Sequence, residues 1–297
     1  DERTLLVEGK KISAQKIVIA TGQVPRKIEI KGSKHFKNSD DFLNLKKLPE
    51  HIVFVGGGYI GMEFAYMAAR AGAKVTVVDT GKRPLHAFDP DLVKALKKYS
   101  ESLGITFIFE AKPTSLKKKR KKHILSYEVK GGIKTIEAHM VFNTAGRVPA
   151  LAELDLDKGN VDFTDSGVVT DDFLQSKSNV NVYACGDVSD KNLPLTPLSG
   201  RQGYVVAENI INGNKKELEV PVVPSVVFTL PNLATVGYSE EEARTRYKNI
   251  IVNYEVSTVW FNAKRINAPL YAYKVILNER TREIVGAHLI GPNAGET

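Results

Sequence analysis

The clearest hydropathy pattern of the chain lies in residues 51–80, HIVFVGGGYIGMEFAYMAARAGAKVTVVDT. Two apolar runs, Ile52 to Val55 and Val75 to Val78, indicate strands. Between them, apolar residues recur at helical spacing and predict a helix that ends at Gly72. The residues expected on one face of this helix are Ile60, Phe64, Met67 and Ala71. The segment therefore predicts a strand–helix–strand unit.

A glycine turn joins the first predicted strand to the helix. Residues Gly56 to Gly61 match the pattern G-x-G-x-x-G in the strand-to-helix position that dinucleotide binding requires. Gly56 can make the tight turn, Gly58 lets the backbone approach a pyrophosphate, and Gly61 allows close packing of helix on strand. The phosphates would face backbone amides and the partial positive charge of the helix N-terminus.

An acidic residue ends the second predicted strand. Asp79 follows Gly56 by about 20 residues, which is where a ribose-binding carboxylate belongs. Glycines alone could mark a tight turn in any strand–helix unit, but strand, glycines, helix and acid together predict a dinucleotide site. Asp79 would repel a 2′-phosphate, so we expect NADH to be favoured over NADPH. Lys82 and Arg83 could instead reach such a phosphate, which leaves NADPH open.

Three other apolar runs end in residues with possible chemistry. KIVIATG ends at Thr21-Gly22, HMVFNTAGR ends at Gly146-Arg147, and NVYACGD ends at Gly186-Asp187. Glycine at a strand end lets the backbone approach a ligand or a neighbouring strand. Taken alone, Asp187 is best interpreted as a turn residue.

Composition places the chain among soluble globular proteins with more than one domain. It has 297 residues, of which 42% are hydrophobic and 26% charged. No apolar run approaches the roughly 18 residues of a membrane helix, and no basic-then-apolar leader opens the chain, so we expect no membrane contact. The one cysteine, Cys185, excludes an internal disulfide and a cysteine-rich zinc site, and it fits a reducing, cytoplasmic compartment. We expect no metal site.

The net charge of +8 is concentrated in one place. The run Lys117 to Lys122, KKKRKK, supplies most of it and lies between segments whose alternation predicts a meander of strands. Like charges at a hairpin tip are most often solvated, although such runs also occur in nucleic-acid-binding proteins. We expect no nucleic-acid partner.

Taken together, these segments resemble the pyridine nucleotide–disulfide oxidoreductase family, which includes glutathione reductase, dihydrolipoamide dehydrogenase and mercuric reductase. The resemblance covers essentially the whole chain. It implies an α/β fold with Rossmann-like, three-layer FAD- and NAD(P)-binding domains and part of an α+β dimerisation domain. The implied boundaries are residues 1–45 and 146–220 for the FAD-binding domain, 46–145 for the inserted NAD(P)-binding domain, and 221–297 for the start of the dimerisation domain.

The resemblance also implies roles for individual residues. Asp187 matches the family's Gly-Asp aspartate, which hydrogen-bonds the flavin ribityl chain, and LPLTPLSGRQG resembles the helix start beside the flavin's pyrimidine edge. Tyr59 would gate the nicotinamide pocket. Glu63 would pair with a lysine beside the flavin, or it is simply a half-buried acid favoured by the helix dipole. The expected cofactor-binding residues are Thr21, Gly22, Gly56, Gly58, Tyr59, Ile60, Gly61, Glu63, Asp79, Gly146, Arg147, Gly186, Asp187, Leu195, Thr196 and Pro197.

The reaction implied by the resemblance is hydride transfer from NAD(P)H to FAD and then two-electron transfer to a disulfide, in a homodimer. The family's FAD-binding G-x-G-x-x-G, its redox cysteine pair and its His-Pro do not occur in this sequence. We therefore expect the middle of a flavoprotein with no catalytic residue in this chain, apart from possible support by Glu63. Cys185 is not a redox partner by position, and His288 is interpreted as a packing residue.

Three alternatives remain open at this point. A related flavoenzyme, such as an NADH oxidase or ferredoxin reductase, would share both cofactor sites but reduce something other than a disulfide. A simple NAD dehydrogenase would lack the FAD segments and would not be yellow. A non-catalytic nucleotide-binding module is the third, because this chain lacks the catalytic thiols.

Overall fold

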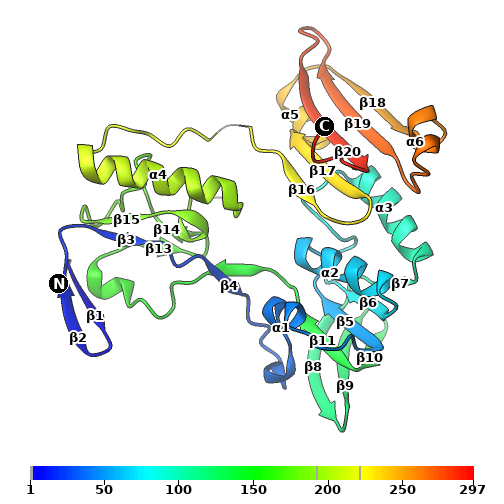
Figure 1. Cartoon of the computed structure of the whole chain (residues 1–297), viewed down its shortest axis with the longest axis horizontal. Helices are drawn as coiled ribbons and strands as arrows, with labels where there is room; N and C mark the ends of the chain where they lie inside the picture. The colour runs from blue at the N-terminus through cyan, green and yellow to red at the C-terminus, as the bar shows by residue number, and fades with distance from the viewer. Residues whose placement is uncertain (1–2, 192, 221) are drawn as a thin grey trace. The chain divides into compact units, whose positions relative to one another are not determined.

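The computed structural model describes residues 3–191, 193–220 and 222–297, which form two compact units (Figure 1). The first unit joins Asp1–Arg26 to Arg147–Pro221, and the second joins Lys27–Gly146 to Val222–Thr297. Residues 27–45, which the resemblance places with the FAD-binding domain, pack in the second unit because Phe42 stacks on Phe64 and contacts Phe54. The predicted division into three domains remains a prediction.

The first unit is built around a parallel strand pair, β3 (Ile17–Ile19) and β15 (Val182–Ala184). Successive side chains of β15 enter different clusters, because neighbouring residues of a strand face opposite sides. Val182 and Ala184 join a cluster with Ile19, whereas Tyr183 and Cys185 pack on helix α4 (Thr196–Asn212). The remaining elements are β1 (Thr4–Val7), β2 (Lys10–Ser13), β4 (Gln23–Pro25), β12 (Arg147–Pro149), η2 (Leu156–Gly159), β13 (Phe163–Thr164), β14 (Gly167–Val168) and η3 (Gly186–Val188).

The second unit contains a four-stranded parallel sheet in the order β11-β5-β6-β7. Its strands are β5 (His51–Val55), β6 (Lys74–Val78), β7 (Ile105–Ile108) and β11 (Met140–Asn143). Phe54 and Val77 face helices α2 (Tyr59–Arg70) and α3 (Pro90–Ser102), whereas Val53 and Val78 face an antiparallel meander. The meander consists of β8 (Lys112–Lys119), β9 (Lys122–Val129) and β10 (Gly132–Ala138). The earlier elements η1 (Ser33–His35) and α1 (Ser39–Leu43) contact β8 and β11, respectively. Burial on both faces explains the unbroken apolar runs.

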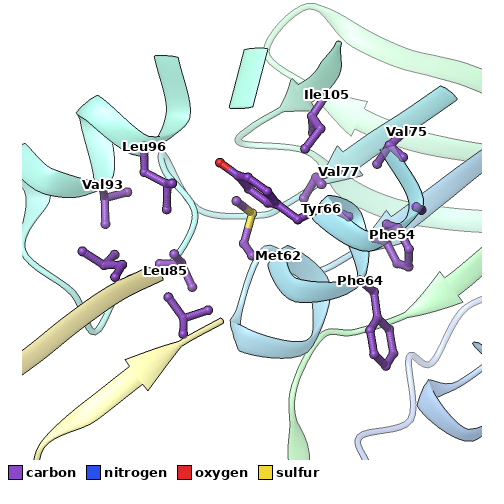
Figure 2. Close-up of a cluster of buried hydrophobic side chains, with 14 of the residues drawn as sticks. Phe54, Met62, Phe64, Tyr66, Val75, Val77, Leu85, Val93, Leu96 and Ile105 are labelled. Atoms are coloured by element: carbon purple, nitrogen blue, oxygen red, sulfur yellow. The ribbon is translucent and has the colours of Figure 1, made fainter. Parts of the chain in front are cut away.

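The buried face of α2 differs from the one expected. Phe64 is buried as predicted, but Met67 is 52% exposed and Ala71 lies beyond the helix end as an exposed cap residue. The buried residues are instead Gly61, Met62, Phe64, Ala65, Tyr66 and Ala68. Figure 2 shows the reason: α2 packs on the sheet and also beside α3, toward which the ring of Tyr66 extends. These two neighbours bury a wider face of α2 than a single stripe. Gly72 follows the helix with a φ of +95°, as expected for its end.

The rest of the second unit is a five-stranded antiparallel sheet in the order β16-β17-β20-β19-β18. The strands are β16 (Ser225–Val227), β17 (Asn232–Gly237), β18 (Ile250–Val256), β19 (Ala272–Asn278) and β20 (Ile284–Gly291), with α5 (Glu240–Arg246) and α6 (Phe261–Arg265). Ser239 caps α5 through a capping box with Glu242. His288 is 2% exposed and lies 2.5 Å from the Thr235 hydroxyl, which agrees with a packing role.

The basic run lies at the tip of the β8–β9 hairpin, and its side chains are exposed. Lys122 forms a surface ion pair with Glu137 at 2.6 Å, and Arg120 adopts a positive φ in the turn. Within the described residues, no helix has the length and apolar character needed to cross a membrane.

A buried hydrogen bond between α2 and α3 gives a test of this packing. The Tyr66 hydroxyl lies 2.7 Å from Ser100 Oγ, which donates to the Leu96 carbonyl at 2.8 Å. Ser100→Ala should lower the free energy of unfolding by about 1–3 kcal/mol, because the buried Tyr66 hydroxyl loses its partner. Ser102→Ala, at an exposed position of the same helix, should change it by less than about 0.5 kcal/mol in the same urea titration. Equal effects of the two changes would contradict this account.

Candidate dinucleotide and flavin sites

The glycine turn between β5 and α2 leaves no room for side chains at two of its positions. Gly56 has a φ of +110°, and a Cβ there would overlap the backbone carbonyl of Thr144. A Cβ on Gly61 would overlap the carbonyl of Gly56 and lie 2.9 Å from Thr144 Oγ1. A Cβ on Gly58 would instead meet open space. Gly56 and Gly61 are therefore required by packing, whereas Gly58 faces an opening that a ligand could fill.

Thr144 supports this turn and was not among the expected site residues. Its hydroxyl oxygen lies 2.7 Å from the carbonyl oxygen of Gly56 and 3.1 Å from that of Val55, and it donates to them. Thr144 directly follows β11, which pairs with β5 in parallel. Parallel strands end at the same edge of a sheet, so this adjacency is the signal that could have placed Thr144 at the turn.

The N-terminus of α2 lies directly after the glycine turn. Gly58 is its N-cap and no side chain caps it within the described residues, so its first amides suit an anion. Tyr59 is 40% exposed, and its ring lies 5.4 Å from that of Phe88 in an edge contact. Burial raises the pKa of Tyr59, so the phenol stays neutral and can donate a hydrogen bond. Ile60 is half-buried against the core beneath.

Asp79 lies against the same turn. Its Oδ2 accepts a hydrogen bond from the Gly57 amide at 2.5 Å, and its Oδ1 accepts one from the Gly81 amide at 2.6 Å. Each carboxylate oxygen has a second lone pair, so Asp79 retains acceptor capacity for ribose hydroxyls. His86 Nε2 lies 3.6 Å from Oδ1, and the His86 ring covers Gly81.

The two cationic side chains that follow Asp79, those of Lys82 and Arg83, differ in their contacts. The Arg83 guanidinium donates to the carbonyls of Leu85 at 2.9 Å and His86 at 3.0 Å, which fixes it within its own loop. Lys82 is exposed. Arg83 therefore stabilises the loop, whereas the Lys82 side chain lies on the surface.

Glu63 contacts the C-terminal sheet rather than solvent alone. Its Oε1 accepts a hydrogen bond from the backbone amide of Phe228 at 2.9 Å, just after β16. The contact ties α2 to that strand. A role for Glu63 beside the flavin remains a prediction.

In the first unit, the parallel pairing of β3 and β15 brings two sets of expected flavin residues to one sheet edge. Thr21-Gly22 follows β3, and Gly186-Asp187 follows β15. The Cys185 amide donates to the Ile19 carbonyl at 3.1 Å and keeps the strand ends in register. Burial raises the pKa of the Cys185 thiol.

Asp187 is held at the start of α4. Ser199 Oγ donates to Asp187 Oδ1 at 3.3 Å, and the preceding Gly186 amide donates to the buried Gln202 side chain at 2.7 Å. Leu195 is the half-buried N-cap, and Thr196 and Pro197 begin the helix with exposed side chains. A carboxylate, a hydroxyl and a helix N-terminus form a donor and acceptor set that fits a polyhydroxyl chain and a polar ring edge, as in a flavin.

Gly146 and Arg147 take part in backbone structure. Gly146 has a φ of +100°, and Arg147 begins β12, which pairs with β4. The Arg147 side chain donates to the Gln23 carbonyl, while Thr21 Oγ1 donates to the Ala150 carbonyl at 2.9 Å. Among the described residues, no group of His, Cys, Asp or Glu is arranged to hold a metal ion.

Comparison with known proteins decides the family. The sequence profile for pyridine nucleotide-disulphide oxidoreductases matches residues 1–203, and the profile for the dimerisation domain of these enzymes matches residues 223–297. The chain belongs to the pyridine nucleotide-disulphide oxidoreductase family. The expected fold class, with Rossmann-like nucleotide-binding domains and part of a dimerisation domain, is thereby confirmed.

Relatives of the chain include two reductases and a dehydrogenase. It is 29% identical to a mercuric reductase of Staphylococcus aureus over 100% of this chain and 54% of that protein. It is 33% identical to a dihydrolipoyl dehydrogenase of Staphylococcus aureus over 94% of this chain and 59% of that protein. A solved Cu(II) complex of the HOCl-induced flavoprotein disulfide reductase RclA from Escherichia coli has a TM-score of 0.90 at 27% identity, covering 100% of this chain and 68% of that one. The chain thus spans about half the length of the curated relatives it matches.

The glycine turn yields a direct test. Gly61→Ala should lower the free energy of unfolding by about 1–3 kcal/mol, because its methyl group would force α2 away from β5. Gly58→Ala, in the same turn but facing open space, should cost less than Gly61→Ala, because it loses only the preference for glycine over alanine at an N-cap, about 0.5–1 kcal/mol. Both values come from denaturant titration without nucleotide. A stable Gly61→Ala variant would show that the turn does not require this close contact.

Proposed function

We propose that the second unit binds a nicotinamide dinucleotide at Gly56 to Gly61, and that the first unit contributes part of an FAD site. The observation that carries the proposal is the combination of the open Gly58 position, the uncapped N-terminus of α2 and the carboxylate of Asp79. Family membership supports it, because the matched profile is that of pyridine nucleotide-disulphide oxidoreductases.

The residues of the chain have distinct tasks in this function. The amides at the start of α2 bind the pyrophosphate, with Gly58 leaving space for its approach. Asp79 accepts hydrogen bonds from the adenosine ribose, and neutral Tyr59 covers the nicotinamide pocket. Asp187, which accepts a hydrogen bond from Ser199, would also accept one from the flavin ribityl chain. Thr196 and Pro197, at the start of α4, would contact the pyrimidine edge of the flavin ring.

A bound flavin would supply the two-electron carrier that links nicotinamide oxidation to disulfide reduction. We infer that the complete protein is an FAD-dependent disulfide oxidoreductase that acts on a small-molecule or protein disulfide as a cytoplasmic homodimer. Dihydrolipoyl dehydrogenase and mercuric reductase chemistry remain alternatives, because both kinds of enzyme are among the relatives.

A second candidate is a nucleotide-binding module without disulfide chemistry. It is favoured for this chain by itself, because its one cysteine cannot form an internal disulfide. Cys185 is also 8% exposed with its pKa raised by burial, which disfavours the reactive thiolate. Reduction of glutathione or lipoamide disulfide by this chain, surviving Cys185→Ser, would exclude this candidate.

We predict that NADH binds more tightly than NADPH. A 2′-phosphate about 4 Å from Asp79 would be repelled by about 4 kcal/mol at an effective dielectric constant near 20, and solvent screening should leave at least about a tenfold preference. The fixation of Arg83 by backbone carbonyls supports this choice, since it is not free to offset the repulsion. Calorimetric dissociation constants of both nucleotides would measure the preference.

The control for this measurement is Asp79→Asn, which keeps a hydrogen-bond acceptor but removes the charge. It should reduce the preference for NADH, whereas Lys82→Ala should leave it intact. Tighter binding of NADPH that is insensitive to Asp79→Asn would mean that Lys82 or Arg83 governs the choice.

We also predict that Asp187→Ala lowers flavin occupancy in the complete flavoprotein. A charge-assisted hydrogen bond typically contributes about 1.5–3 kcal/mol, so the flavin should be lost on dilution and dialysis. Absorbance at the flavin maximum relative to protein gives the occupancy. Asp172→Ala, an exposed aspartate of the same unit, is the matched control. Full occupancy in the Asp187→Ala protein would reject the assignment.

A further inference from the structure

A buried lysine lies where the C-terminal sheet meets the start of α3. Lys274, on β19, is only 2% exposed, and its Nζ lies 2.9 Å from Asp89 Oδ2, 2.5 Å from Asp91 Oδ2 and 3.1 Å from Glu240 Oε2. Asp89 is fully buried, whereas Asp91 and Glu240 are partly exposed. A buried charge is costly to leave unpaired, so the interaction between Lys274 and Asp89 constrains both elements strongly.

Asp89 ends the loop that begins at the dinucleotide site. Its other oxygen, Oδ1, caps α3 by accepting from the amides of Asp91 at 3.0 Å and Leu92 at 3.1 Å. One carboxylate thus fixes the start of the helix and, through Lys274, attaches it to β19. The loop Thr80–Asp89 is therefore held at one end by Asp79 and at the other by the ion pair.

The same loop contacts the glycine turn and the first turn of α2. The Leu85 amide donates to the Gly57 carbonyl at 2.9 Å, and the Phe88 amide donates to the Leu85 carbonyl at 3.0 Å. Phe88 packs its ring edge on Tyr59, and both Leu85 and Phe88 are 2% exposed. A displacement of Asp89 would move Phe88, its neighbour in sequence, and with it the support of Tyr59 and Gly57.

We propose that Lys274 is a positioning residue for the dinucleotide site, acting through its ion pair with Asp89 to hold the loop Thr80–Asp89 against the glycine turn and Tyr59. Lys274 itself does not touch the nucleotide. The inference rests on the proposed dinucleotide binding at Gly56 to Gly61. It makes the C-terminal sheet part of the nucleotide site, through one buried side chain.

The sharpest variant is Asp89→Asn. Asparagine retains an oxygen that can cap α3, so the variant removes the charge of Asp89 without removing the cap. We expect the dissociation constant of NADH to rise at least tenfold, and Lys274→Met should raise it to a similar extent. The variant that carries both changes should bind NADH no more weakly than the single variant with the higher dissociation constant, because both changes remove the same ion pair.

Matched controls separate positioning from general loss of stability. Ser100→Ala removes a buried hydrogen bond elsewhere on α3, and Asp91→Asn removes a partly exposed carboxylate while leaving Lys274 and Asp89 paired. Both should bind NADH within twofold of the unmodified chain at a temperature where every variant is folded. Hydrogen exchange should show lost protection at the amides of Leu85 and Phe88 in Asp89→Asn but not in Ser100→Ala.

The outcomes are distinct. If Asp89→Asn binds NADH within twofold of the unmodified chain, or if Ser100→Ala weakens binding as much, the positioning role of Lys274 is wrong. If Lys274→Met does not fold, the binding of NADH to Asp89→Asn alone decides the question.

If the unmodified chain binds neither NADH nor NADPH, the proposed function fails. In that case hydrogen exchange at Leu85 and Phe88 still tests whether the ion pair holds the loop, and unchanged protection would overturn it.

Discussion

The close approach of α2 to β5 is the contact on which the second unit depends. Gly61 lies against the carbonyl of Gly56, and Thr144, directly after the neighbouring strand β11, donates a hydrogen bond to that carbonyl. No side chain separates the helix from the strand here, so the N-terminus of α2 reaches the edge of the sheet. Within the described residues, no side chain caps its first backbone amides. The same turn brings the Gly57 amide to Asp79, at the end of the next strand of the parallel sheet.

Local sequence signals were sufficient where structure is determined by neighbours along the chain. The glycine turn and the end of α2 at Gly72 are each specified within a few residues, and the structure has them as predicted. The exposure of Met67 could not be obtained in this way. It depends on which sides of α2 the sheet and α3 cover, and helical spacing alone does not contain that information.

Contacts between distant segments were also beyond the sequence pattern. Lys274 stands among alternating residues of a strand, where a lysine ordinarily indicates the solvent face, yet carboxylates from α3 and α5 surround it. Asp79 was expected to bind ribose, but its contacts to the Gly57 and Gly81 amides appear only in the folded turn. In the first unit, the strand ends at Gly22 and Gly186 were identifiable, whereas the contact of Asp187 with Ser199 depends on the start of α4.

The location of Cys185 has a practical consequence for measuring local unfolding of the first unit. Its side chain is buried between β15 and α4, and it is the single cysteine of the sequence. An alkylating reagent can therefore modify the chain only when that part of the first unit opens, while unfolding of the second unit adds no reactive thiol. The rate of alkylation reports the local opening free energy of one unit in the presence of the other, without any introduced label.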